Sequence, residues 1–203
     1  VNNYRDKDGN IIQPNAKPGD FKWADLNGDG KIGSEDRTFI GDPTPTWSYG
    51  FTINASYKQF DLVLFGQGVT GNEIFNALRR LDVANANWTT AALGRWTGEG
   101  STNTFPRLTT DDANGNFKNP STFYLSDGAY FRIKNLQIGY TLPNSIAQKA
   151  GLKRVRIYLG SGNLLTLTKY TGFDPEIGGG SYGIDRGVYP QARSYMVGLN
   201  LGL

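Results

Sequence analysis

Residues 25–36 carry oxygen-bearing side chains at the spacing of an EF-hand calcium loop. Positions 1, 3, 5 and 12 of such a loop supply side-chain oxygens, position 7 a backbone carbonyl, and a glycine at position 6 allows the sharp turn. Here Gly30 occupies position 6. Ca²⁺ prefers hard oxygen ligands, so the sequence predicts a calcium site. The predicted ligands are Asp25, Asn27, Asp29, Lys31 (through its carbonyl) and Asp36.

Two interpretations of this acidic loop remain open from the sequence. Position 12 is Asp36 where many EF-hand loops have glutamate, and the shorter side chain reduces the reach for bidentate binding. The alternative is a solvated Asp/Asn/Gly turn, closed by hydrogen bonds from the backbone to side-chain oxygens. If calcium binds, we expect a structural ion, since no second loop of this kind is visible to form a signalling pair.

The composition excludes several classes of chemistry. The 203 residues include no histidine and no cysteine, which rules out Ser-His-Asp triads, thiol nucleophiles and disulfides. The candidate catalytic carboxylate pairs are Asp111–Asp112 and Asp174/Glu176. Both lie in Asn- and Gly-rich segments, where acidic side chains are usually just solvated. We therefore expect that the protein is not an enzyme. The net charge of +3 is scattered, and no basic face for nucleic acid is visible.

The sequence after the acidic loop predicts mainly β-strands. Trp47 to Tyr57 alternates apolar and polar residues with period two, and 60–69 reads as its hairpin partner across a two-residue turn. Three further alternating segments predict strands over about 130–142, 155–162 and 195–203. The spacing of Ile74, Phe75, Leu78 and Leu81 predicts a short helix over 73–81. A brief helical turn is expected over 143–151, with Ser145 as its cap and Gly151 as its stop.

The predicted strands are joined by connections that alternate between long and short. Residues 1–46 form a long loop that contains the acidic motif, and 47–203 form the strands, with long loops at 70–129 and 168–192. Outer-membrane β-barrels pair short periplasmic turns with long extracellular loops. A periplasmic C-terminus would place every long connection outside the cell.

The residues on the two faces of these strands favour a membrane barrel. The second face carries small neutral residues instead of the charges of a soluble sheet, and aromatic residues lie near strand ends, as in a membrane girdle. The alternative is a soluble secreted calcium-stabilised β-domain that binds glycans. Such a domain would bury Leu62, Leu64, Ile138, Leu199 and Leu201, whereas a barrel would expose them. In either case Trp88 and Trp96 are the candidate substrate-binding residues, because loop indoles can stack on ligands.

The order of several motifs resembles the C-terminal part of the SusC/RagA family of TonB-linked outer-membrane transporters of Bacteroidetes. The matching blocks are Trp23–Ile32, Tyr57–Leu62, Gln67–Asn72, Tyr130–Leu136, Gly139–Pro143, Gly162–Thr166, Tyr170–Glu176 and Tyr189–Arg193. The resemblance implies an all-β fold: the last antiparallel strands and extracellular loops of a transmembrane β-barrel of about 22 strands. This sequence departs from the family pattern at Leu203, because such barrels commonly end on an aromatic residue.

The resemblance also implies a function and partners. The parent protein would import nutrients, glycans or peptides, across the outer membrane as the barrel of a SusCD-like complex. Its partners would be a SusD-like surface lipoprotein, outer-membrane lipid, the substrate, and the TonB complex through the N-terminal part of the parent chain. Neither nucleic acid nor catalysis is expected.

Overall fold

The computed structural model describes residues 3–83, 86–177 and 181–203, and the chain divides into two compact units. Unit 1 consists of Val1–Ile40 and Ala77–Tyr124, and unit 2 of Gly41–Asn76 and Leu125–Leu203. Each of the three predicted long loops includes residues outside the described ranges, namely 1–2, 84–85 and 178–180. The first unit therefore joins most of the N-terminal loop to the middle of the 70–129 loop.

Unit 2 contains the strands. They are β1 (Trp47–Tyr57), β2 (Phe60–Thr70), β3 (Glu73–Asn76), β4 (Leu125–Asp127), β5 (Tyr130–Thr141), β6 (Arg154–Thr168), β7 (Ile184–Asp185) and β8 (Ser194–Gly202). Short helical segments are the α-helix α1 (Asn144–Ala147) and 3₁₀ turns at Ser34–Asp36, Thr90–Gly94, Thr122–Tyr124 and Gln148–Ala150. Among the described residues, none of the helices has the length and apolar character needed to cross a membrane.

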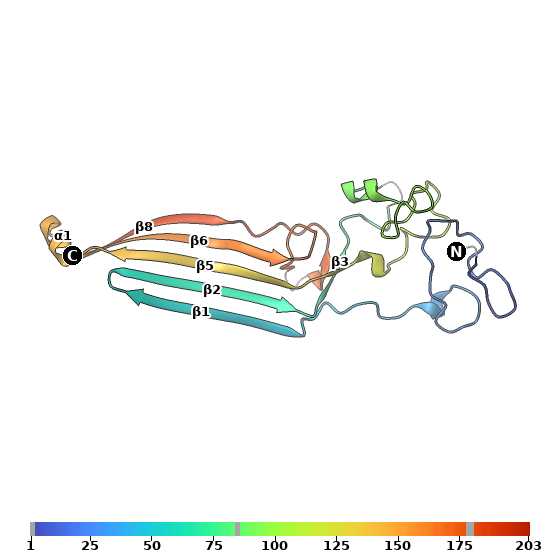
Figure 1. The fold of residues 1–203 in the computed structure, drawn as a ribbon, viewed down its shortest axis with the longest axis horizontal. Coiled ribbons are helices and arrows are strands. Elements are labelled where there is room, and N and C mark those ends of the chain that lie inside the picture. Colours follow the sequence, from blue (N-terminus) through green and yellow to red (C-terminus); the bar gives the residue numbers. More distant parts are fainter. Residues whose placement is uncertain (1–2, 84–85, 178–180) are drawn as a thin grey trace. The chain divides into compact units, whose positions relative to one another are not determined.

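The five long strands form one antiparallel sheet in the order β1-β2-β5-β6-β8 (Figure 1). The two short connections, at 58–59 and 142–153, lie at one end of the sheet together with the C-terminus (Figure 1). The connections at 71–129 and 169–193 leave from the other end. The five predicted strands are therefore confirmed, although β6 continues to Thr168, six residues beyond the predicted end at 162. Long connections alternate with a short one at 58–59 and a moderate one at 142–153.

The register gives the sheet one apolar face and one polar face. Residues that pair directly across two antiparallel strands point to the same side. Ile53 pairs with Leu64, and Leu64 pairs with Leu136, so the apolar positions of three strands are aligned. On the other side, Asp61 pairs with Gly139, and Gly139 with Tyr158.

The strand pairing is irregular at two places in the half of the sheet nearer the long connections. The register shifts between Phe65 and Gly66 where β2 pairs with β5, and between Ile133 and Asn135 where β5 pairs with β6. Bulges of this kind increase local twist and redirect side chains. Beyond the first bulge, Phe131 stacks near Phe51, with ring centroids 5.8 Å apart, over the space left by Gly66.

The segment after β2 is a strand and not the predicted helix. Glu73–Asn76 forms β3, which pairs antiparallel with β4 and parallel with β7. Ile74 is 1% exposed within this small sheet. The apolar spacing that fits a helical face over 73–81 is satisfied instead by pairing with two segments far along the chain.

The connection between β5 and β6 contains the expected helical turn. Gly151 ends it with φ +73°, a left-handed conformation that glycine adopts without steric cost. The predicted cap is wrong by two residues, because Pro143 occupies the cap position before Asn144, and Ser145 lies inside the turn. Proline suits this position, since the first N–H groups of a helix have no internal partner.

Unit 1 has little regular structure and is held by aromatic packing. Phe117 contacts the rings of Phe21, Trp88, Phe105 and Phe123, with centroids 4.5–6.5 Å apart. Such edge and tilted ring pairs are favourable beyond their buried area. This cluster gives unit 1 a core of its own.

Candidate functional site

The acidic loop lies in unit 1 and is closed by hydrogen bonds to its own side chains. The two carboxylate oxygens of Asp25 accept from the N–H groups of Gly28 (2.7 Å) and Gly30 (2.9 Å). Both glycines have positive φ, +76° and +80°. The left-handed turns at these two positions are therefore what brings the backbone donors onto Asp25.

The remaining predicted ligands close the rest of the loop. Asn27 and Asp29 each accept a hydrogen bond from the N–H two residues ahead, at 3.0 and 2.8 Å, which are Asx turns. Asp36 accepts from the N–H of Gly33 at 2.7 Å and of Leu26 at 2.8 Å. These two donors lower the pKa of Asp36, because they stabilise its charged form.

The acidic loop has the oxygen donors of a cation site, but they do not converge on one point. In the described ranges, no group of three or more acidic, histidine or cysteine side chains converges at metal-binding distance. Each of the oxygens involved accepts one backbone N–H and has a second lone pair, so its capacity to coordinate is retained. The hydrogen bonds are those expected of the closed Asx turn, and the donor set is the hard-oxygen set that suits Ca²⁺.

The two candidate indoles also lie in unit 1, and both residues contact Phe105. The backbone N–H of Trp96 donates to the carbonyl of Phe105 at 2.9 Å, while the Trp88 ring lies 6.3 Å from the Phe105 ring. Trp96 packs directly on Gly19, where any Cβ would approach the indole to 2.4 Å. Its ring is thus part of the packing of the unit.

Trp88 is the more accessible of the two indoles. It is 39% exposed, and the guanidinium of Arg79 lies 4.0 Å from its ring centroid. An open hollow of about 580 Å³ adjoins the indole. Besides Trp88, the hollow is lined by Arg107, Leu108, Thr109, Thr110 and Asp111. Arg107 is held there by a bidentate pair with Asp20, a residue whose side chain is 1% exposed.

In unit 2, the polar face of the sheet carries a charged cluster near the long connections. Arg132, 3% exposed, donates to Asp174 and to Glu176, both at 2.7 Å, and to the hydroxyl of Thr166 at 2.8 Å. Lys134 donates to both oxygens of Glu176. Burial raises the pKa of Asp174, but the N–H of Gln191 and the Arg132 guanidinium outweigh it, and the net effect is a lowered pKa.

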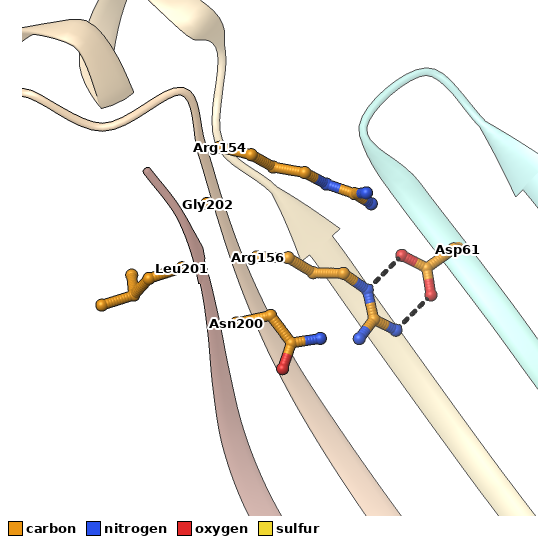
Figure 2. Close-up of a pocket in the computed structure, with 6 residues that line it drawn as sticks. All are labelled: Asp61, Arg154, Arg156, Asn200, Leu201 and Gly202. Atoms are coloured by element: carbon orange, nitrogen blue, oxygen red, sulfur yellow. Dashed lines mark hydrogen bonds and ion pairs between the residues drawn. The ribbon is translucent and has the colours of Figure 1, made fainter.

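A second charged group lies on the same face near the short connections (Figure 2). Arg156 of β6 reaches across β5 to Asp61 of β2, with Nε to Oδ1 at 2.9 Å and Nη2 to Oδ2 at 2.5 Å. This reach depends on Gly139 between them, because a Cβ there would lie 2.4 Å from the guanidinium. Arg154 and Asn200 line the same hollow (Figure 2).

The apolar face of the sheet is exposed, which distinguishes the two interpretations of the strands. Ile138, Leu199 and Leu201 are 48%, 58% and 55% exposed. A soluble domain would bury these side chains against a second layer. The side chains of Leu62 and Leu64 are half-buried. The sheet therefore presents an apolar face without a covering layer in the described residues, as the barrel interpretation predicts.

Neither charged cluster is predicted as a site from the sequence. The sequence-based interpretation of the pair Asp174/Glu176 is of solvated acids, whereas the structure pairs both with Arg132. Arg132 and Glu176 are 44 residues apart, and Asp61 and Arg156 are 95 apart. One signal was present: charged residues at polar-face positions of otherwise neutral strands, which require partners when buried.

Comparison with known proteins identifies TonB-dependent receptors as relatives of this chain. No protein-family model matches the chain. TonB-dependent receptor P3 of Formosa agariphila is 39% identical over 200 residues, covering 94% of this chain and 20% of the receptor. TonB-dependent receptor SusC of Bacteroides thetaiotaomicron is 25% identical, covering 94% of this chain and 18% of the receptor. This chain therefore spans about a fifth of the length of these relatives.

Solved structures of the RagAB peptide importer share the fold. Its 'open-open' state superposes with a TM-score of 0.67 and 27% identity over 89% of this chain and 20% of that chain. Its 'closed-closed' state gives 0.68 and 30% over 91% and 20%. The five-stranded sheet is thus a segment of a barrel wall of this type, with the barrel not closed within the chain. The chain is homologous to the TonB-dependent receptors over about nine tenths of its length.

Proposed function

We propose that this chain is the wall and outer loops of an outer-membrane importer that takes up nutrients with TonB-derived energy. The exposed apolar face of the five-stranded sheet carries this proposal, supported by the homology to TonB-dependent receptors. A SusD-like surface lipoprotein is the expected partner, because SusC and the RagAB importer are among the similar proteins. No step of catalysis is assigned to the chain.

Fractionation of source cells tests the proposal. An antibody against the loop at 1–46 should detect the parent protein in the outer membrane, at a mass on the order of 100 kDa for a large barrel. A soluble or secreted band near 22.3 kDa would instead favour the glycan-binding domain. Deletion of the parent gene should then abolish growth on the imported nutrient.

A structural calcium ion in the acidic loop is part of the proposal. Asp25, Asn27, Asp29, Asp36 and the carbonyl of Lys31 would hold it, and the ion would rigidify unit 1 against unfolding and proteolysis. In the full-length receptor, EGTA should increase trypsin cleavage within 1–40. Asp25→Asn should remove this calcium dependence, whereas Asp8→Asn, in a neighbouring exposed turn, should preserve it. Equal cleavage with calcium and with EGTA would contradict the calcium site.

Trp88 is the proposed contact to substrate, and Trp96 was the second candidate. The Trp88 indole is exposed beside an open hollow, whereas the Trp96 indole packs on Gly19. Trp88→Ala should reduce uptake of the natural substrate. Because the Trp88 ring also packs on Phe117, proteolysis of unit 1 is measured in parallel, and uptake should fall by more than any loss of folded receptor. Trp96→Ala should instead destabilise unit 1, seen as faster proteolysis. Uptake unaffected by Trp88→Ala would remove this residue from the substrate path.

A further inference from the structure

Three side chains of the sheet hold the carboxylate of Glu176. It accepts hydrogen bonds from Nη1 of Arg132 at 2.7 Å and from Nζ of Lys134 at 2.6 and 2.8 Å, with a longer one from the amide of Gln67 at 3.4 Å. Gln67 of β2 pairs directly with Arg132 of β5, so both side chains lie on the polar face. Two cations and an amide thus form a receptor for one carboxylate, an anion that makes strong hydrogen bonds to such donors.

A β-bulge supplies the second cation. Ile133 and Asn135 both have partners on β2 and on β6, whereas Lys134 between them has none in either ladder. Lys134 is therefore the extra residue of the bulge, and its side chain reaches the same carboxylate as that of Arg132. Bulges redirect side chains and are common next to functional sites.

The two acidic residues of the 169–193 connection are bound in different ways. Asp174 is 3% exposed and accepts the backbone N–H groups of Glu176 and Gln191 at 2.8 Å, in addition to Nη2 of Arg132. The side chain of Glu176 is 26% exposed, and in the described part of the chain only side chains donate to its carboxylate. The Glu176 side chain can therefore rotate into solvent while Asp174 keeps the backbone in place.

A carboxylate is the group that can replace Glu176. With Asp174 still bound, departure of Glu176 alone would leave one of the two cations uncompensated, and loss of one partner of a buried ion pair is costly. A second carboxylate restores both the charge and the hydrogen bonds, whereas a neutral group restores neither. The Arg132 guanidinium donates through Nε to Thr166 at 2.8 Å, so it is already oriented for this ligand.

We propose that Gln67, Arg132 and Lys134 form a carboxylate-binding site, which Glu176 fills in the unliganded protein and a carboxylate of the imported solute fills in its place. That the ligand is an imported solute rests on the proposed function, whereas the exchange of carboxylates rests on the geometry of this cluster. A peptide C-terminus and an acidic sugar both supply the group.

Ligand-detected NMR titration of the full-length, detergent-purified receptor tests the site. The probes are N-acetyl-trialanine with its C-terminal amide, and galacturonic acid with galactose, so that each carboxylate has a neutral counterpart. The wild-type receptor should bind a carboxylate probe and not its counterpart. Because an intramolecular carboxylate competes at an effective concentration in the millimolar range, Glu176→Gln should tighten binding by about tenfold or more. Glu99→Gln, which removes an exposed acid elsewhere, is the matched control and should bind as the wild type does.

The outcomes separate the alternatives. Binding of N-acetyl-trialanine identifies a peptide C-terminus as the source and binding of galacturonic acid an acidic sugar, and either supports the site if Lys134→Gln abolishes it. Four results would overturn the proposal: no binding of either carboxylate, equal affinity of the wild type and Glu176→Gln, binding that survives Lys134→Gln, or equal binding of sulfate. If a variant does not fold, the wild-type comparison of each probe with its neutral counterpart still decides. Import enters none of these measurements, so binding by a receptor that is absent from the outer membrane would overturn the proposed function and leave the site.

Discussion

Arg132 is a buried charged residue of unit 2 with three side-chain partners. Its guanidinium is 3% exposed and binds Asp174, Glu176 and Thr166. A buried ion pair contributes little net stability against a hydrophobic replacement, but removal of one partner leaves the others as uncompensated buried charges. The cluster therefore fixes where the 169–193 connection meets the sheet.

Removal of the Arg132 charge should destabilise unit 2 strongly. Arg132→Gln leaves Asp174 without its cationic partner, and we expect the free energy of unfolding to fall by about 3–5 kcal/mol. Guanidinium unfolding of the detergent-solubilised receptor measures the change. Arg80→Gln is the matched control, because the Arg80–Asp82 pair is solvent-exposed and should contribute nothing measurable. Equal stability of both variants would show that the cluster is not a structural clamp.

The same cluster should make the 169–193 connection sensitive to acid. The pKa of Asp174 is lowered in the folded state from its ordinary value of 3.8. A lowered pKa means that its stabilisation is complete above pH 3.8 and is lost as the pH falls through the folded-state pKa. Limited proteolysis with pepsin should show the connection protected at pH 5 and cleaved progressively below about pH 3.8. In Asp174→Asn this pH dependence should be reduced.

The long strands could be predicted from sequence because their signal is local. β1 and β8 alternate apolar and polar residues along their length, and β5 and β6 do so over part of theirs. β2 follows from the two-residue turn at 58–59, which makes it the hairpin partner of β1. The ligand spacing of the acidic loop is equally local. β3 could not be assigned, since Ile74 and Phe75 fit a helix or a strand, and the choice was made by β4 and β7. The partners of Arg132 are likewise distant in sequence.

Glycines on the apolar side of β2 set how closely the strands and aromatic rings can pack. A Cβ at Gly68 would lie 2.4 Å from the backbone carbonyl oxygen of Tyr130 and 2.6 Å from the hydroxyl of Tyr49. Gly68→Ala should therefore disrupt the pairing of β2 with β5 and reduce the yield of folded receptor in the outer membrane. Gly98→Ala, with no atom within 4 Å of the added carbon, should have normal yield. Normal yield of both variants would mean that the sheet adapts.

The five-stranded sheet exposes two unpaired edges and a large apolar face. Both edge strands, β1 and β8, have one neighbour within the described residues, and the apolar face has no covering layer. Unpaired edges and large apolar patches promote association. Residues 1–203 expressed alone should aggregate in plain buffer and become dispersed in detergent, as measured by light scattering. A monodisperse monomer in plain buffer would contradict the assignment of this face to lipid.

The parallel pairing of β3 with β7 has a consequence for the order of folding. Phe75 and Ile184 are about 110 residues apart, so this ladder has a much higher contact order than the hairpin of β1 and β2. Closing so long a segment costs entropy that only later contacts offset. We therefore expect the pairing of β3 with β7 to form later than the hairpin of β1 and β2. Ile74, which is 1% exposed in the folded structure, would stay uncovered until β3 is paired. A chaperone could bind this segment during that interval.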